Sequence, residues 1–216
     1  MSLTTLKNLR LVIPGVFILI AIFLIIPNKI DELKNNFNEF IKFDFKDILY
    51  TASFILFGVL YHISKLRLRF WNPFLSTVQN NIKDTLLKPF LNTFDENKIA
   101  SLREGRKLLN VFYHFVDTTP SLTEKSNLVR FNGLLWTSFV DLTVISLIAT
   151  IVIDVKMFFH YSIYNLYLLF GFMVIALFSF WLVHRLLKTH IKLGNEQLEI
   201  ITELHLNELR DKLINL

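Results

Sequence analysis

The sequence contains no cysteine in its 216 residues. That absence excludes a disulfide framework, a thiol nucleophile and a metal site with cysteine ligands. The six histidines do not show the paired spacing of a metalloprotease helix. The chain also lacks a glycine-rich phosphate loop, and its serines lack the strand–turn–helix setting of a nucleophile elbow. We therefore predict no catalytic residue, no metal ligand and no cofactor, and we expect a protein that is not an enzyme.

Apolar residues, in contrast, are abundant. Hydrophobic residues make up 53% of the chain, and phenylalanine alone occurs 22 times. A soluble domain of this size buries only about two thirds of its surface, so its core has no room for this much apolar surface. A lipid bilayer does have that room, and the composition predicts an integral membrane protein.

Four apolar segments have lengths suited to crossing a bilayer, for which roughly 20 helical residues are needed. They cover residues 11–27, 48–63, 134–153 and 163–183. The second is the shortest and carries polar residues, so its alternative is an interfacial or re-entrant segment. We predict an all-α, polytopic membrane protein with four transmembrane helices, a helical cytoplasmic loop domain and a C-terminal cytoplasmic helix.

The first segment follows Lys7 and Arg10, a basic start that signal peptides also have. It lacks a cleavage site of the small-x-small kind, so we interpret it as an uncleaved span. Pro14 is expected in the first turn of this span, where a missing N–H costs little.

Lysine and arginine gather on one side of the predicted membrane. The loop 65–133 carries eleven of them against six acidic residues, and the N-terminus and the start of the tail are also basic. Cytoplasmic loops carry this excess. With four spans all three regions fall on the same side, which supports the second span. The pattern predicts a protein of the inner membrane with both termini in the cytoplasm.

The spans divide the chain into four parts. Residues 1–64 form an N-terminal transmembrane hairpin, and residues 134–186 form a second one. Residues 65–133 are predicted to form a cytoplasmic helical domain, and residues 187–216 a cytoplasmic amphipathic helix. Within the first hairpin, Asn28–Asp47 alternates phenylalanine with charged residues. It is either an amphipathic helix in the headgroup layer or a connecting loop.

Three prolines punctuate the loop domain, namely Pro73, Pro89 and Pro120. Between them the apolar periodicity predicts helices at Leu75–Lys88 and Asn97–Val116. Ser121 followed by Glu124 has the spacing of a capping box. A new helix is therefore expected to start at Ser121 and to run into the third span.

Leucines recur with 3-4-3 spacing at the end of the tail, at Leu206, Leu209, Leu213 and Leu216. This is the a/d pattern of a short coiled coil, which predicts self-association or contact with a partner helix. Packing of the same amphipathic helix on the loop domain is the alternative. Upstream, the fourth helix either continues through Gly194 or breaks there.

Asp141 is the one ionisable side chain well inside a predicted span, so it should face the bundle interior or water. One interpretation is an ion, proton or gating site, with Thr143 and Ser146 lining the same polar path. The other is a carboxyl group hydrogen-bonded to neighbouring hydroxyls. Helical rise puts Asp141 roughly 10 Å from the cytoplasmic end of the span, near the interface.

Four basic residues that flank the spans are expected at the membrane surface, namely Arg67, Arg69, Arg185 and Lys188. Arg185 and His190 also have an Arg-x4-His spacing, which resembles the ribonuclease motif of HEPN-type domains. That resemblance implies action on a ribose hydroxyl and its phosphate. Membrane topology alone accounts for the basic excess of the loop, so nucleic-acid binding is not indicated.

The plan of four spans, cytoplasmic loop and helical tail resembles small membrane components of bacterial antiphage systems, such as that of Kiwa. The resemblance implies an oligomeric membrane sensor that acts with a soluble cytoplasmic effector. We expect a non-enzymatic anchor or sensor that binds a cytoplasmic protein through residues 65–133 or the C-terminal helix. The alternatives are a pore-forming effector that uses Asp141 and a membrane-tethered, HEPN-like ribonuclease.

Overall fold

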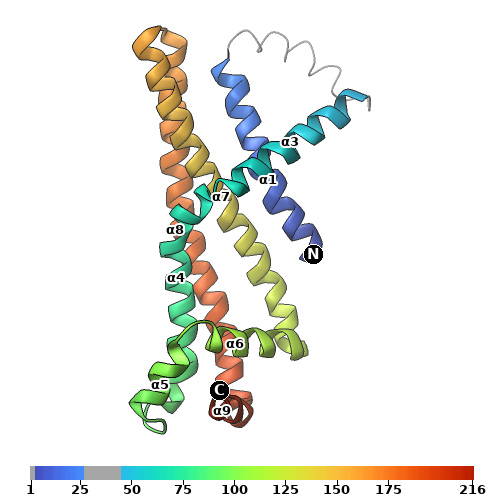
Figure 1. Ribbon diagram of the computed structural model, residues 1–216, viewed down its shortest axis with the longest axis vertical. Coiled ribbons are helices and arrows are strands. Elements are labelled where there is room, and N and C mark those ends of the chain that lie inside the picture. Colours follow the sequence, from blue (N-terminus) through green and yellow to red (C-terminus); the bar gives the residue numbers. More distant parts are fainter. Residues whose placement is uncertain (1–2, 27–44) are drawn as a thin grey trace. The chain divides into compact units, whose positions relative to one another are not determined.

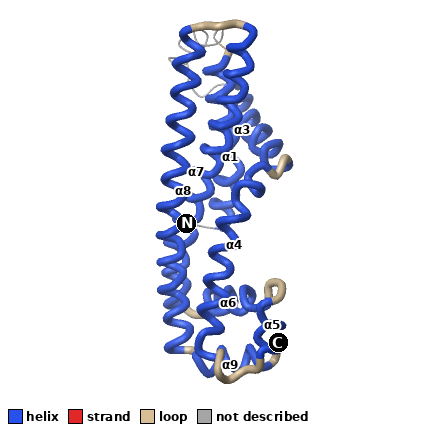
Figure 2. Tube along the Cα trace, turned by 90° about the vertical axis from the view of Figure 1, so that its left-hand side faces the viewer, coloured by secondary structure: helices blue, strands red, loops and turns tan. Residues whose placement is uncertain are grey.

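A computed structural model of the chain describes residues 3–26 and 45–216, and every regular element in that part is a helix (Figures 1 and 2). In chain order the elements are α1 (Leu3–Ile25), α3 (Phe45–Ile63), α4 (Leu66–Leu87), the 3-10 turn η2 (Lys88–Phe90), α5 (Glu96–Arg103), α6 (Lys107–Thr118), α7 (Pro120–Phe159), α8 (Ile163–Leu204) and α9 (Leu206–Ile214).

Three of the described helices are long and apolar enough to cross a membrane. They cover Thr4–Ile25 in α1, Pro120–Phe159 in α7 and Ile163–Leu204 in α8. A shorter apolar stretch, Ala52–Ile63, lies in α3. This confirms the predicted helical class and supports insertion into a membrane. Most of Asn28–Asp47 lies outside the described residues, so the choice between helix and loop there stays a prediction.

The chain forms two compact units. The membrane unit comprises residues 1–71 and 134–184, and the loop–tail unit comprises residues 72–133 and 185–216. The loop and the tail, treated separately in the sequence, therefore pack into one body. The helices α7 and α8 each contribute residues to both units.

In the membrane unit, α1 and α3 cross in direct contact (Figure 1). Two buried glycines permit this approach. A Cβ atom on Gly15 would collide with the carbonyl oxygen of Phe54, and one on Gly58 with the carbonyl oxygen of Leu11. Helices in lipid associate mainly through such close packing of small residues. The crossing therefore depends on the absence of both side chains.

The C-terminal end of α1 is held by the other two long helices. The Lys156 ammonium of α7 donates a hydrogen bond to the Ile25 carbonyl at 2.7 Å, and the Tyr164 hydroxyl of α8 donates to the Leu24 carbonyl at 3.0 Å. Carbonyls in the last turn of a helix have no donor within the helix. The lysine also places a positive charge at the negative end of the helix dipole.

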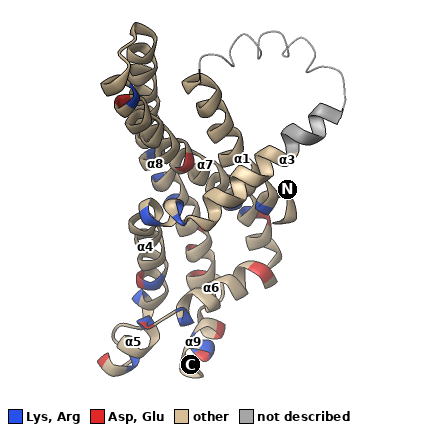
Figure 3. Cartoon of the chain, turned by 45° about the horizontal axis from the view of Figure 1, so that its top comes forward, with Lys and Arg blue, Asp and Glu red and all other residues tan. Residues whose placement is uncertain are grey.

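The loop–tail unit has its own hydrophobic core, which receives fully buried side chains from each of its α-helices: Leu86 of α4, Leu102 of α5, Leu108 of α6, Leu122 of α7, Leu198 of α8 and Leu209 of α9. Basic and acidic residues are interspersed along these helices (Figure 3). Asp84 and Arg103 form one of its ion pairs at 2.8 Å, with side chains 60% and 50% exposed. The unit therefore combines an apolar core with charged residues at its surface.

Several predicted boundaries are wrong. The helix predicted at Leu75–Lys88 begins earlier, as α4 runs from Leu66 through Pro73. An interior proline removes one backbone donor at a cost of ~3 kcal/mol. The helix continues because side chains pack on both sides of the proline. Trp71 packs against Trp136 with tilted rings before it, and Ile82 enters the core after it.

The helix predicted over Asn97–Val116 is two helices. The chain breaks between α5 and α6 at Gly105, whose φ of +59° lies in the left-handed region that glycine tolerates best. The predicted start of the third membrane helix at Ser121 is off by one residue, because Pro120 is the first residue of α7. Proline suits that first position, where its missing N–H has no helical partner. The helix does run into the third span, as expected.

Pro14 lies in the interior of α1 rather than in its first turn, since the helix already begins at Leu3. Downstream, α8 continues through Gly194 and ends at Leu204. A helical glycine costs only about 0.5–1 kcal/mol, which the packing of the loop–tail unit offsets. The final helix, α9, then begins at Leu206.

Candidate functional site: a buried ion pair in the membrane unit

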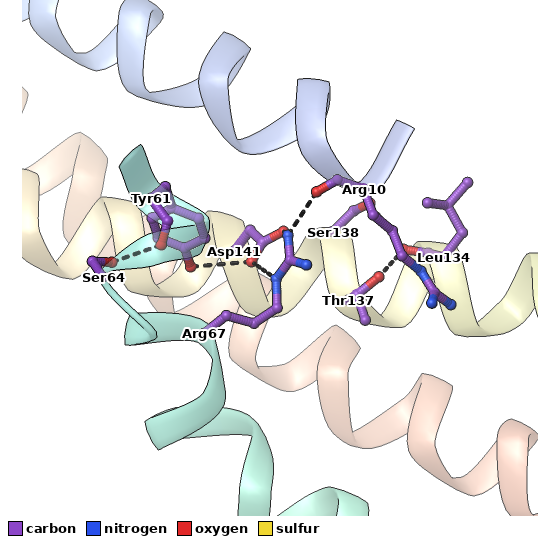
Figure 4. Close-up of polar contacts among 8 residues, drawn as sticks. All are labelled: Arg10, Tyr61, Ser64, Arg67, Leu134, Thr137, Ser138 and Asp141. Carbon is purple, nitrogen blue, oxygen red and sulfur yellow. Dashed lines mark hydrogen bonds and ion pairs between the residues drawn. The ribbon is translucent and has the colours of Figure 1, made fainter. Parts of the chain in front are cut away.

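The candidate site is centred on Asp141, in the middle of α7 (Figure 4). Only 1% of this residue is exposed. The neighbouring hydroxyls on α7 do not satisfy its carboxylate. Thr137 and Ser138 both donate to the Leu134 carbonyl at 2.9 Å. The donors to Asp141 come from other helices.

Arg67, in the first turn of α4, is the main partner of Asp141. Its Nε donates to Oδ1 at 2.7 Å, and its Nη2 donates to Oδ2 at 2.6 Å. This is the two-pronged geometry in which a planar guanidinium matches a carboxylate, and it is among the strongest hydrogen-bonded pairs in proteins. The Arg67 side chain is 14% exposed. The pair is therefore almost entirely removed from solvent.

Tyr61, near the end of α3, adds a third donor. Its hydroxyl lies 3.0 Å from Asp141 Oδ1. The guanidinium of Arg67 also lies over the Tyr61 ring, 5.8 Å from its centroid, a distance at which cation–π attraction acts. The tyrosine thus contacts both members of the ion pair.

A tight turn between α3 and α4 brings Tyr61 and Arg67 to the same carboxylate. Ser64 donates its hydroxyl to the Tyr61 carbonyl at 2.6 Å, and the Leu66 amide donates back to the Ser64 hydroxyl at 3.4 Å. Lys65 has a φ of +55°, which is uncommon for a residue with a side chain. The chain adopts this conformation at the bend between α3 and α4.

The network extends to α1 through a backbone carbonyl. Arg67 Nη2 donates to the carbonyl oxygen of Arg10 at 2.8 Å. That carbonyl would ordinarily accept from the amide four residues later, which is Pro14 and has no N–H. Prolines are tolerated in membrane helices where a neighbour satisfies the freed carbonyl in this way. Pro14 therefore creates the acceptor that Arg67 uses.

The result is a polar tie that joins α1, α3, α4 and α7 through Arg10, Tyr61, Arg67 and Asp141. Burying one charge in an apolar environment is costly, whereas a paired and hydrogen-bonded set is tolerated. Once formed, the tie is hard to open, because separating its members would leave an uncompensated charge. Its chemical capacity is to hold four helices in one arrangement.

The other two residues of the predicted polar path have different surroundings. Thr143 donates to the Phe139 carbonyl and also bonds the Ser179 hydroxyl of α8, both at 2.8 Å. Ser146 is 1% exposed, and within the described residues its hydroxyl has no hydrogen-bond partner. Both side chains are buried in the single chain, as Asp141 is.

The four predicted membrane-surface cations divide into two groups. Arg67 is turned inward to Asp141, whereas Arg69, Arg185 and Lys188 are exposed. His190, the second residue of the Arg-x4-His motif, lies in the loop–tail unit with its Nδ1 3.3 Å from the Asn132 side-chain amide. Among the described residues, no group of three or more His, Asp or Glu side chains is arranged to hold a metal ion.

The leucines of the predicted seam are also divided. Leu209 and Leu213 are 0% exposed and belong to the core of the loop–tail unit, whereas Leu206 and Leu216 are 38% and 45% exposed. Leu209 and Leu213 therefore pack inside the loop–tail unit, as expected if the amphipathic helix packs on the loop domain.

Sequence reasoning identified Asp141 but not its partners. Arg67 was assigned to the membrane surface, and Tyr61 was not singled out. A signal for the contact was present: a carboxylate inside a span needs a cation, and Arg67 is among the basic residues nearest to a predicted span end. Pro14 stands four residues after Arg10 and has no N–H, so the sequence also indicates that the Arg10 carbonyl lacks its helical donor.

No protein-family model, curated protein or solved structure was found to match this chain. Function is therefore inferred from three features of the molecule: the geometry of the buried tie, the two units and the distribution of exposed apolar residues.

Proposed function

We propose that the chain is a four-span protein of the bacterial inner membrane. It anchors a cytoplasmic protein partner at the membrane and acts as the membrane sensor for that partner. Both termini and the loop–tail unit lie in the cytoplasm in this proposal, and the protein acts as a homo-oligomer. The resemblance of the predicted layout to the membrane component of Kiwa extends the proposal to antiphage defence.

The observation that carries the proposal is the polar tie around Asp141. The one acid inside a predicted span bonds an arginine through both its oxygens and a tyrosine through one. Asp141 therefore fixes the positions of the helices around it. A membrane anchor needs such a fixed arrangement of its helices. Because α7 belongs to both units, a change in its packing within the membrane unit can be relayed to the loop–tail unit.

The same tie supports the fourth span. The Arg10 carbonyl, early in α1, lies 2.8 Å from Arg67, at the start of α4. In the proposed arrangement the chain leaves along α1 and returns along α3, which would bring Arg67 back beside the start of α1. Residues 72–133 and 185–216 belong to one compact unit. In this proposal they lie on the same side of the membrane, and α7 and α8 each cross it once.

The pore and nuclease alternatives receive less support. In one chain Asp141 and Ser146 are each 1% exposed and do not line a water path, so a pore would have to form by opening the tie or between copies. For the nuclease, Arg185 is exposed whereas His190 is half-buried beside Asn132. Two residues five apart on a continuous helix are rotated about 140° from one another, which separates the motif's two side chains.

The surface best suited to a protein partner is the end of the tail. Leu204 is 74% exposed, Ile214 51% and Leu216 45%. Exposed apolar residues that gather in one segment mark interaction sites on soluble surfaces. Deleting the tail is not a clean test, because Leu198 and Leu209 are core residues of the unit.

The test uses the full-length chain with the substitutions Leu204→Ser and Leu216→Ser together. Tagged protein is purified from solubilised membranes of the source cells, and the molar ratio of each co-purifying soluble protein is measured. We expect one protein at a constant ratio with wild type and its loss with the double variant. Leu91→Ser, 50% exposed in the same unit, is the matched control and should retain it.

Recovery of no soluble protein at constant ratio from wild type would contradict the anchor proposal. Equal recovery from the double variant would move the partner site to residues 65–133. Light scattering on the same detergent-solubilised samples gives the mass of the protein part, and a value equal to one chain of 25.4 kDa would contradict the oligomer.

A further inference from the structure

The membrane unit contains a second feature, an apolar groove between α1, α3 and α7, with a volume of about 550 Å³. Its walls include Ile18 and Ile22 of α1, Phe57 of α3, and Ile148, Ala149 and Val152 of α7. Tyr61 and Ser64 close one end, beside the polar tie. The lining is almost wholly hydrocarbon.

We propose that this groove is a binding site for one acyl chain of a membrane phospholipid, whose phosphate is engaged by Lys156. The proposal rests on membrane insertion and does not require the protein partner. Three features support it: the medium around the groove, the size of the groove and the charge at the end opposite Tyr61.

The medium follows from the helices that form the groove. Both α1 and α7 have the length and composition of membrane spans, and the groove lies along their apolar parts. Its opening therefore faces the lipid acyl chains of the bilayer. Water does not fill an apolar cavity of this kind, and a lipid acyl chain is the hydrocarbon that the bilayer supplies to fill it.

The size fits one chain. Binding sites for small ligands range over about 300–1,000 Å³, and this groove lies within that range. If a methylene group takes up about as much space as a water molecule, roughly 30 Å³, the groove holds roughly 18 such groups. That number corresponds to one long acyl chain.

The charge at the end opposite Tyr61 determines the class of lipid. Lys156 lies one helical turn beyond Val152, and its ammonium bonds the carbonyl of Ile25, a groove residue. An ammonium has three N–H donors, and the bond to Ile25 uses one of them. The others are available to a phosphate oxygen, so a phospholipid with its phosphate at Lys156 would extend its chain toward Tyr61.

The first test needs no variant. The protein is reconstituted in phosphatidylcholine vesicles that contain a small fraction of phosphatidylglycerol with a diazirine in its acyl chain, irradiated, digested and mapped by mass spectrometry. A bound chain labels Phe57 and Ala149, although Ala149 is only 3% exposed. Labelling concentrated on Phe170 and Leu177 of α8, which are 67% and 69% exposed, would show fluid lipid only and would overturn the site.

The second test fills the groove. Ile148 is 40% exposed and lines it, so Ile148→Trp takes up part of its volume without a change in the buried core. We expect Phe57 labelling to fall, because the indole ring takes space that the bound acyl chain would occupy. Ile151→Trp, one turn away at a site 63% exposed and outside the groove, is the matched control and should label as wild type. Equal labelling of both variants would contradict the proposal.

The third test concerns the headgroup. Lys156→Gln removes the ammonium that would bind the phosphate, so it should label in the groove more weakly than wild type with the same diazirine phosphatidylglycerol. If a diazirine fatty acid without a phosphate competes as well as the phospholipid, the phospholipid assignment is wrong. If cysteines introduced at Ile148 cross-link two copies, the groove is a contact between chains and the lipid site is excluded.

Discussion

At the residue scale, the stability of the membrane unit depends on keeping Arg67 and Asp141 together. Water cannot solvate either charge if the pair separates, since the two side chains are 14% and 1% exposed. The free energy of the pair is therefore asymmetric. Removing both charges leaves an apolar site, whereas removing one leaves a buried ion without a counter-charge.

A double-mutant cycle measures that asymmetry. Arg67→Met leaves the Asp141 carboxylate unpaired and should lower the free energy of unfolding by about 3–5 kcal/mol. Adding Asp141→Leu should restore most of the loss, because an apolar pair of similar volume replaces the ions. Thermal unfolding in detergent gives both values.

The control for this cycle is the exposed Asp84–Arg103 pair, whose removal should cost only about 0–1 kcal/mol. A double variant less stable than Arg67→Met alone would show that the tie is not the reason for the loss.

Lys65 offers a second prediction at this scale, because its left-handed backbone sets the turn between Tyr61 and Arg67. A residue with a Cβ loses roughly 1–2 kcal/mol in that conformation, and glycine loses far less. Lys65→Gly should therefore keep or raise the unfolding temperature, whereas the β-branched Lys65→Val should lower it. Circular dichroism during heating provides the measurement, and the opposite order of the two variants would show that the turn is not left-handed.

At the scale of elements, sequence patterns located most helices but not their contacts. The spans in α1, α7 and α8 follow from length and hydropathy, which are local properties. The pairing of Arg67 with Asp141 joins residues 74 apart in sequence and requires the α3–α4 turn to be known first. The break at Gly105 and the passage of α4 through Pro73 were missed because local propensity is weak against packing on the flanks.

The α1–α3 crossing yields the third prediction. Gly15→Ala would place a methyl group against the Phe54 carbonyl, and Gly58→Ala against that of Leu11, so each must push the two backbones apart. We expect each to lower stability by about 1–3 kcal/mol, the usual cost of overpacking. Gly171→Ala is the matched control in α8, where a Cβ meets nothing within 4 Å.

That control should be neutral or stabilising by about 0.4–1 kcal/mol, because alanine reduces the freedom of the unfolded chain. Unfolding in detergent distinguishes the three variants. If Gly15→Ala and Gly171→Ala behave alike, the two helices do not meet at their glycines.

At the scale of the whole molecule, the chain consists of two compact units, the membrane unit and the loop–tail unit. Figures 1 and 3 show the helices of each unit and their charges. Three spans are long enough by composition, and the fourth is inferred from the contact between the start of α1 and the start of α4. The number of crossings decides whether the N-terminus shares a side with the loop.

Thiol labelling tests this topology cleanly, because the natural chain has no cysteine and each introduced one is the sole thiol. Single cysteines are placed at the exposed positions Thr4, Asn110, Tyr161 and Asn215. Spheroplasts are treated with a membrane-impermeant maleimide before and after lysis. With four spans, Tyr161 is labelled in intact spheroplasts, and the other three are labelled only after lysis.

The comparison of Thr4 with Asn110 decides directly whether α3 crosses the membrane. If the chain has four spans, both stay unlabelled until lysis, because α1 and α3 then cross the membrane in opposite directions. If Thr4 is labelled in intact spheroplasts while Asn110 is protected, α3 does not cross. The four-span account would then be wrong.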